Sequence, residues 1–255
     1  MSSPIILSRT PFRLSLGGGS TDLPSYYEKH GGFIFAVTIN LYMDVLIKAT
    51  RSDDLINVHY KSFEITQMLG LPDGVQDPYV CAHGGFVLLD IEKDGKVRVR
   101  KPHVSADAIR QFFGNSLFFY TGVARESRHI LAEQDAGKIL ELKHRTKAIG
   151  QDIYRAFQKG KLGEFGELMD EHWKVKKAMS ARMTSSLFDD IYDAARRAGA
   201  LGGKILGAGG GGYFIFYCPS EKKKQAVRHA LEKFRMREMH FSLDARGART
   251  KVVVP

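Results

Sequence analysis

Two clusters of glycine residues give the strongest chemical signal in the sequence. The first, at 17–19, is followed at once by Ser-Thr-Asp, and the second spans 207–212 with one alanine among five glycines. Because glycine lacks a side chain, its backbone N–H groups can approach a phosphate or a sugar closely. The alternative for either cluster is a tight turn, or a close crossing of a strand and a helix.

Neither cluster matches a standard nucleotide-binding motif. A P-loop would continue with Gly-Lys-Ser or Gly-Lys-Thr, which neither cluster does. A dinucleotide-binding fingerprint would place an acidic residue about 20 positions further on, and neither cluster fits that pattern. The glycines therefore predict a binding loop of another kind.

The first half of the chain reads mainly as β-structure. Apolar and β-branched runs predict strands, and Asp94-Gly95 is a strong signal for a two-residue hairpin turn. A second hairpin is predicted with its turn at Asn40. The predicted strands are 5–8, 33–38, 41–49, 56–60, 86–91, 97–99 and 116–120, with a helix over 23–30 that the preceding Ser-Thr-Asp could cap.

Helical patterns dominate the second half. Apolar residues recur close to every 3.6 positions, Gly160 and Gly199 occupy the place that glycine favours after a helix, and Ser185 is a candidate N-cap. The predicted helices are 136–159, 165–177, 185–198 and 221–234, with strands flanking the second glycine cluster within 204–216 and a last strand at 251–254. This mixture predicts an α+β fold, with a strand-rich domain over 1–132 and a second domain over 133–255.

Composition excludes several classes of protein. An apolar fraction of 44% and a charged fraction of 26% are typical of soluble globular chains. The net charge of +10 suits anionic ligands, but the basic residues are spread over several helices without interleaved aromatic residues, so nucleic-acid binding is not expected. No apolar run approaches the roughly 18 residues that cross a membrane, and the N-terminus lacks a secretory pattern.

A few other residues attract attention but have simple interpretations. Cys81 and Cys218 lie far apart and are expected to be buried thiols in a reducing compartment, which predicts a cytoplasmic location. Trp173 is expected in the core, with His172 beside it at the rim. The nine histidines show no metal-ligand spacing, so no metal site is predicted from them.

Taken together, the two clusters resemble the sequence motifs of the GHMP kinases, the family of galactokinase, homoserine kinase and mevalonate kinase. Residues 9–22 follow the pattern R-x-P-x-R-x-S-x-G-G-G-x-T-D, most like the bacterial D-glycero-α-D-manno-heptose 7-phosphate kinases of that family. Residues 204–212, K-I-L-G-A-G-G-G-G, resemble its C-terminal motif. Residues 74–86 resemble the segment with the catalytic aspartate, and 119–134 also match the heptose kinases.

The resemblance implies roles for particular residues. Asp77 would take or orient the proton of the acceptor hydroxyl, and Arg13 would keep that carboxylate ionised. A turn residue before Pro78 is the alternative for Asp77. Asp22 would bind sugar hydroxyls or cap a helix, and Arg125 would hold the substrate's phosphate or form a surface ion pair.

The implied binding residues fall into two groups. Those expected to bind the substrate are Gly18, Gly19, Ser20, Thr21, Asp22 and Arg125. Those expected to form the nucleotide-side glycine loop are Gly207, Ala208, Gly209, Gly210 and Gly211.

One motif of the family is missing from this sequence. GHMP kinases carry a glycine- and serine-rich loop before the catalytic aspartate, which opens a helix that would hold the phosphates of ATP. Here residues 63–71 run straight into 72–74, without such a loop and without several tens of expected residues. A natural deletion, an engineered shortening and a segment left out of the sequence as it stands all remain open.

The resemblance predicts a GHMP-kinase-like two-domain fold from which part of the nucleotide-binding region is absent. It implies an ATP- and Mg²⁺-dependent kinase that phosphorylates the anomeric hydroxyl of a sugar phosphate, expected to be D-glycero-D-manno-heptose 7-phosphate. The expected partners are the sugar phosphate and ATP, with no nucleic acid and no membrane, and a homodimer is left open. The alternative is a truncated or degenerate family member that binds sugar phosphate without kinase activity.

Overall fold

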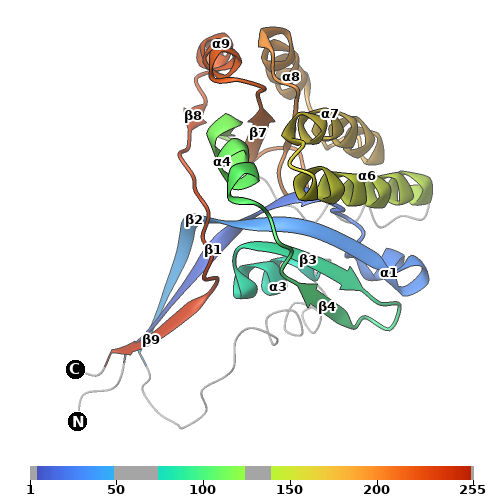
Figure 1. Cartoon of the computed structure of the whole chain (residues 1–255), viewed down its shortest axis with the longest axis vertical. Coiled ribbons are helices and arrows are strands. Elements are labelled where there is room, and N and C mark those ends of the chain that lie inside the picture. Colours follow the sequence, from blue (N-terminus) through green and yellow to red (C-terminus); the bar gives the residue numbers. More distant parts are fainter. Residues whose placement is uncertain (1–4, 49–73, 124–138, 254–255) are drawn as a thin grey trace.

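A long antiparallel sheet forms one half of the structure, a computed structural model that describes residues 5–48, 74–123 and 139–253 (Figure 1). Its central strands are long because β1 and β2 pair along most of their length, interrupted by two irregularities. The strands, in their order across the sheet, are β4 (Val97–Arg100), β3 (Phe86–Ile91), β2 (Gly32–Lys48), β1 (Ile5–Gly17) and β9 (Arg249–Val253).

A second antiparallel sheet lies on the other side of two helices. Its strands, in order, are β6 (Gly202–Ile205), β7 (Tyr213–Tyr217), β5 (Ser116–Tyr120) and β8 (Arg237–Glu238). Thus β5 from the first half joins the second sheet, whereas β9 near the C-terminus returns to the first. The chain therefore passes between the two sheets more than once, and the two-domain division near residue 132 stays a prediction.

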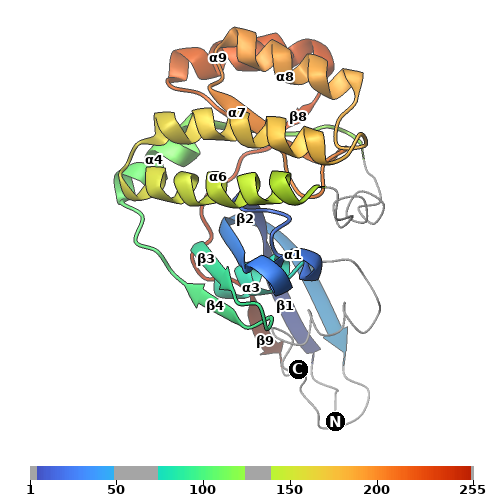
Figure 2. The same ribbon diagram turned by 90° about the vertical axis from the view of Figure 1, so that its right-hand side faces the viewer.

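The helices form layers between and around the sheets (Figures 1 and 2). Helix α6 packs on β1 and β2, and α7 packs between α6 and β6, so both lie between the sheets. Helices α8 and α9 lie beyond the second sheet, and α3 packs on the first. The bounds are α1 (Pro24–His30), α3 (Gln76–His83), α4 (Ala106–Asn115), α6 (Leu140–Gln158), α7 (Leu162–Met179), α8 (Ser186–Ala198) and α9 (Glu221–Leu231), followed by η2 (Glu232–Phe234).

The first part of β2, residues 32–39, is buried on both faces, with a period of two residues. Phe35 and Val37 belong to the core shared with α6 and α7. Ile34 and Ala36 point the other way and pack with Tyr27 of α1 and the residues around α3. The first sheet therefore holds α6 on one face and α3 on the other.

The predicted turn at Asn40 is wrong. Strand β2 runs without a break from Gly32 to Lys48, since Pro11 pairs with Tyr42 and Phe12 pairs with Ile39. Two residues of β2 are thus left over at this point and form a bulge rather than a hairpin. The Asn40 N–H donates to the Ser242 carbonyl oxygen at 2.9 Å, and Oδ1 of Asn40 accepts from the Ser242 N–H at 2.7 Å, so these groups are satisfied without a turn.

Most other predicted elements are confirmed. The predicted hairpin joins β3 to β4, but its turn is longer than the two residues predicted, since the Gly95 N–H donates to the Glu92 oxygen at 3.0 Å and the Glu92 N–H to the Lys96 oxygen at 2.8 Å, with Gly95 at a φ of 84°. Ser185 caps α8, and Gly199 ends it in a left-handed conformation. The helices over 76–83 and 106–115 were not predicted, and the predicted strand at 56–60 lies outside the described residues.

Both cysteines are free, with Cys218 fully buried but Cys81 only partly so. Among the described residues, no helix combines the length and the apolar character that a membrane crossing requires. The cytoplasmic location stays a prediction.

Candidate functional site

Arg13 and Asp77 form an ion pair between β1 and the first turn of α3, 64 residues apart in the chain. The Arg13 side chain is 14% exposed, whereas that of Asp77 is 65% exposed, so the pair presents its carboxylate to solvent. Burial opposes the charge of Arg13, but the attraction and hydrogen bond of Asp77 exceed this and raise the arginine's pKa. The two residues predicted to act together are thus in direct contact.

Asp22 lies beside this pair and is almost fully buried, with 2% of its surface exposed. Its Oδ2 accepts a hydrogen bond of 3.2 Å from the backbone N–H of Gln76, at the start of α3. Burial raises the pKa of Asp22, and the charge of Asp77 adds to this, while the Gln76 N–H and Arg13 lower it. Asp22 therefore binds the start of α3, whereas α1, which follows it in sequence, has no side-chain cap.

Gly74 is required where α3 approaches Asp22. A Cβ atom at this position would lie 2.0 Å from Oδ2 of Asp22, closer than any such contact in proteins. The absence of a side chain at Gly74 thus lets the chain reach Asp22 and place Asp77 next to Arg13.

Thr21 anchors the first glycine cluster to β2. Its Oγ1 lies 2.8 Å from the carbonyl oxygen of Gly18 and 2.9 Å from that of Phe33, and it accepts a bond from the Phe33 N–H. The residue is completely buried, so these contacts account for its hydroxyl group. Ser20 is also buried and adopts a positive φ of 76°, which is uncommon for a residue with a side chain.

The three glycines at 17–19 differ in what surrounds them. A Cβ on Gly17 would lie 2.5 Å from Cα of Gly150 in α6, and one on Gly18 would lie 1.9 Å from the Phe33 oxygen. These two positions thus serve the close crossing of backbone segments. At Gly19 the nearest atom to a Cβ would be Ser15 Oγ at 3.4 Å, so packing alone does not require glycine there.

The second glycine cluster joins β6 to β7 and also contains two kinds of position. A Cβ on Gly209 would lie 1.8 Å from Sδ of Met183, and Gly210 N donates to the Met183 oxygen at 2.7 Å. A Cβ on Gly211 would lie 2.8 Å from the Val123 oxygen. Gly207, in contrast, is exposed and has no atom within 4 Å of such a Cβ, so its backbone is open to a ligand.

Lys204 of β6 connects the two glycine clusters from within. Its Nζ donates to the carbonyl oxygen of Leu16 at 3.0 Å, directly before the first cluster, and lies 3.1 Å from Nδ1 of His172. Lys176, one turn along α7 from His172, donates to the carbonyl oxygen of Gly207 at 2.7 Å. Both clusters are thus held at their first residues by buried basic side chains.

This basic group has unusual electrostatics. Lys204 is 2% exposed and His172 is completely buried, so the predicted place of His172 at the rim is wrong. Burial lowers the pKa of Lys204 well below its usual range, and the charges of Lys176 and Arg13 lower it further. The pKa of His172 is also lowered well below its usual value, first by burial and then by the charges of Lys204 and Lys176. The site is therefore poor in negative charge around these two residues.

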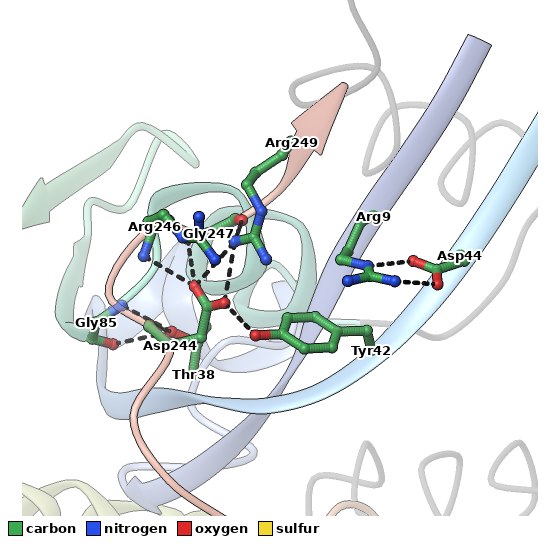
Figure 3. Close-up of polar contacts among 9 residues, drawn as sticks. All are labelled: Arg9, Thr38, Tyr42, Asp44, Gly85, Asp244, Arg246, Gly247 and Arg249. Carbon is green, nitrogen blue, oxygen red and sulfur yellow. Dashed lines mark hydrogen bonds and ion pairs between the residues drawn. The ribbon is translucent and has the colours of Figure 1, made fainter. Parts of the chain in front are cut away.

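Asp244 fixes the other end of α3 (Figure 3). Its carboxylate accepts bonds from Tyr42 Oη at 2.7 Å, from Arg249 at 3.0 Å and from the backbone N–H groups of Arg246 and Gly247. Its carbonyl oxygen accepts from the Gly85 N–H at 2.8 Å, just after α3. The C-terminal segment thereby holds the helix that carries Asp77.

Several predicted features cannot be placed. Arg125 and the segment over 63–73 lie outside the described residues. Within the described ranges, no three histidine, cysteine, aspartate or glutamate side chains are arranged to hold a metal ion. The sequence patterns predicted no functional role for Lys204, His172, Lys176 or Asp244. The available signal was a lysine at the head of the second motif, in a strand with apolar neighbours.

Comparison with known proteins shows what the sequence and the fold resemble. Residues 153–237 match the sequence family described as GHMP kinases C terminal. A D-glycero-α-D-manno-heptose 7-phosphate kinase of Campylobacter jejuni is 22% identical over 335 aligned positions, which cover 96% of this chain and 98% of the relative. The chain has 255 residues, so at least 80 of those positions have no counterpart in it.

Solved structures show the same fold. A D-glycero-D-manno-heptose 1-phosphate kinase of Bacteroides thetaiotaomicron superposes with a TM-score of 0.72 at 20% identity, covering 98% of this chain and all of the other. A Lactococcus lactis galactokinase, in complex with galactose, gives a TM-score of 0.65 at 14% identity, covering 96% of this chain and 95% of the other. The chain therefore carries a GHMP kinase C-terminal domain within a GHMP kinase fold, as its motifs predicted.

Proposed function

We propose that this protein is an ATP-dependent sugar kinase that phosphorylates the anomeric hydroxyl of a sugar phosphate, with D-glycero-D-manno-heptose 7-phosphate as the expected substrate. The observation that carries the proposal is the ion pair of Arg13 and Asp77, with Asp22 beside it. The fold and the relatives that phosphorylate heptose phosphates support the choice of reaction and substrate.

The chemistry follows from this pair. The oxygen of the sugar's anomeric hydroxyl forms a bond to the terminal phosphorus of ATP, while the Asp77 carboxylate accepts the proton of that hydroxyl. The bond between this phosphorus and the ADP oxygen breaks, and ADP leaves. Arg13 stabilises the charged carboxylate before the transfer. Asp22 would accept hydrogen bonds from sugar hydroxyls through its remaining oxygen, and the open backbone of Gly19 would let the sugar approach.

The proposed ATP side is the second glycine loop. Gly207 is exposed and Lys176 is bonded to its carbonyl oxygen, so the loop is held in place and has a basic group close by. The described residues do not themselves form a set of metal ligands. Mg²⁺, when bound, would neutralise charge on the phosphates of ATP, which would also supply most of its ligands.

A second candidate is a binding protein that holds sugar phosphate without transferring phosphate. The observation that favours it is the length of the chain, since at least 80 positions of the Campylobacter jejuni relative have no counterpart here. The glycine- and serine-rich loop expected for the family is also missing from the sequence. For this case we expect ATP to bind more weakly than about millimolar.

One pair of measurements separates the two candidates. The intact chain, its length confirmed by mass spectrometry, is incubated with ATP, Mg²⁺ and heptose 7-phosphate, and phosphorus NMR detects a new anomeric phosphate. Calorimetry measures the binding of the sugar phosphate alone. Turnover supports the kinase, binding without turnover supports the binding protein, and the lack of both would contradict the two proposals together.

A further inference from the structure

A basic pocket lies where α1, part of α6 and the β3–β4 turn meet (Figure 1). Its volume is about 350 Å³, and none of its lining residues belongs to the predicted site. The side chains that matter for the argument are Tyr26, Lys29, His30, Lys93, His144 and Lys147. They come from three separate segments of the chain, which only the fold brings together.

The walls of this pocket are fixed by contacts of their own. Tyr26 is 1% exposed, and its hydroxyl group lies 2.8 Å from Nδ1 of His144. The rings of His30 and His144 meet edge to face, with 4.7 Å between their centroids. Lys147 donates to the carbonyl oxygens of His30 and Gly31, both at 2.8 Å, so its ammonium group is held at the end of α1. The pocket is therefore largely preformed, which lowers the entropic cost of binding.

The charges around the pocket are mostly of one sign. Burial lowers the pKa of His30, and the neighbouring His144, Lys93, Lys147 and Lys29 lower it further. Two acidic groups lie near enough to influence the walls. The charge of Glu141 adds to the effect of burial in raising the pKa of Tyr26, and that of Asp90 opposes the lowering of the pKa of Lys147 by burial. Asp90 is already paired with Arg100 at 2.8 Å. An anion in this pocket would thus meet three lysines and two histidines with little competing negative charge.

We propose that this pocket binds the phosphate group of a small phosphorylated metabolite. A phosphate dianion offers several strong acceptor oxygens, which match the ammonium groups of Lys29, Lys93 and Lys147 in charge-assisted hydrogen bonds. The ring edges of His30 and His144 complete the wall, and His30 gains a proton when the anion neutralises its surroundings. The proposal does not depend on kinase activity, because it uses none of the residues of the candidate site.

Inorganic pyrophosphate is a suitable probe for the full-length chain. Calorimetry measures its affinity for the parent protein and for the double variant Lys29→Gln, Lys93→Gln. Both lysines are exposed, so the fold is expected to survive. The matched control is Lys222→Gln, Lys233→Gln, which removes the same net charge from exposed positions at α9 and η2. We expect the pocket variant to lose at least about tenfold in affinity and the control to lose less than about twofold.

Histidine NMR provides a second readout that a general charge effect would not produce. Saturating pyrophosphate is expected to raise the pKa of His30, because a bound anion stabilises the imidazolium form. The ring signals of His103, which lies outside the pocket, are expected to stay unchanged when pyrophosphate is added. Equal losses of affinity in both double variants, or an unchanged His30, would overturn the proposal.

The same phosphate chemistry could belong to the substrate or to a separate metabolite, and a third measurement distinguishes them. If the pocket holds the substrate's own phosphate, heptose 7-phosphate displaces pyrophosphate, and the pocket variant binds that sugar phosphate more weakly. If the phosphate belongs to another metabolite, heptose 7-phosphate and pyrophosphate bind independently, and Asp77→Asn leaves the affinity for pyrophosphate unchanged. Either result agrees with a phosphate-binding pocket.

Discussion

The side-chain nitrogen of Lys204 lies 3.0 Å from the carbonyl oxygen of Leu16, across 188 residues of sequence. This contact joins the strand that leads into the second glycine loop to the strand that leads into the first. Because Lys204 is buried and lies close to the charges of Lys176 and Arg13, its pKa is lowered well below the usual range. The two loops are thus linked by a buried hydrogen bond from a lysine to a backbone carbonyl group.

The charge state of Lys204 predicts how stability depends on pH. Its pKa is about 10.5 in the unfolded chain and well below that in the fold, so the unfolded chain binds more protons between the two values. The contribution of Lys204 to the free energy of unfolding is therefore full above pH 10.5 and falls as the pH is lowered. As the pH rises through this window, we expect the free energy of unfolding of the parent to increase relative to that of Lys204→Met, by up to about 1.4 kcal/mol per pH unit.

Urea denaturation at several pH values between 7 and 9.5 measures this difference. Lys222→Met, at an exposed position of α9, serves as the control and is expected to follow the parent at every pH. A difference between the parent and Lys204→Met that does not change with pH would mean that Lys204 stays charged in the fold.

Asp244 predicts a separate sensitivity to acid. Burial opposes its charge, but hydrogen bonds from Tyr42, Arg249 and two backbone N–H groups exceed this and lower its pKa to about 2. Since the folded pKa lies below the usual 3.8, the contribution to stability is full above about pH 4 and is lost as the pH falls through 2. We expect Asp244→Asn to lower the free energy of unfolding by about 2 kcal/mol at pH 7, and by much less at pH 2.

Chemical denaturation at pH 7, 4 and 2 tests this expectation, with the exposed Asp193→Asn of α8 as the control. A loss of the same size at all three pH values would show that the shape of the side chain matters, rather than its charge.

Asp77→Asn tests the proposed role of the carboxylate in catalysis. We expect turnover to fall by at least about a hundredfold, with little change in the dissociation constant of the sugar phosphate, because the amide keeps the shape but cannot accept the proton. Asp107→Asn, in an exposed ion pair with Arg110 on α4, is the control. Turnover within threefold of the parent would return Asp77 to the alternative of a turn residue.

Gly207 and Gly209 separate ligand binding from packing within one loop. Gly207→Val places its side chain in open space at a φ of 73°, and we expect sugar-phosphate or nucleotide binding to be lost at a modest cost of about 1–2 kcal/mol in stability. Gly209→Val would meet Met183, so we expect a clear fall in the melting temperature instead. Thermal unfolding and calorimetry of both variants measure the two effects. Intact binding by Gly207→Val would assign the whole loop to packing.

Arg125 remains a prediction from the sequence. A bidentate contact with the substrate's phosphate contributes about 1.5–3 kcal/mol. We therefore expect Arg125→Ala to lower the affinity for heptose 7-phosphate by ten- to more than a hundredfold. The affinity for the unphosphorylated heptose should change little, which calorimetry with both sugars can show. Equal losses for the two sugars would assign Arg125 to the fold or to another part of the sugar.

Local patterns in the sequence were sufficient for the features that depend on neighbouring residues. Asp94-Gly95 specified its hairpin and Ser185 its helix cap, because each interaction closes within a few positions. The motif resemblance also selected Arg13 and Asp77 to act together, and the structure places these two in contact, with the buried Asp22 near enough for their charges to shift its pKa. The hairpin turn predicted at Asn40 was wrong, because a polar residue between two apolar runs is compatible with a bulge as well as with a turn.

The sequence by itself determined which loops need a bare backbone and which acidic and basic residues accompany them. Only the tertiary structure decided what each loop contacts. Lys204 reads as an ordinary lysine in a strand until the fold places Leu16 and His172 around its side chain. The physical reason is that burial and hydrogen-bond partners come from segments far apart in the chain. The pattern within one segment cannot specify which carbonyl group of another will meet it.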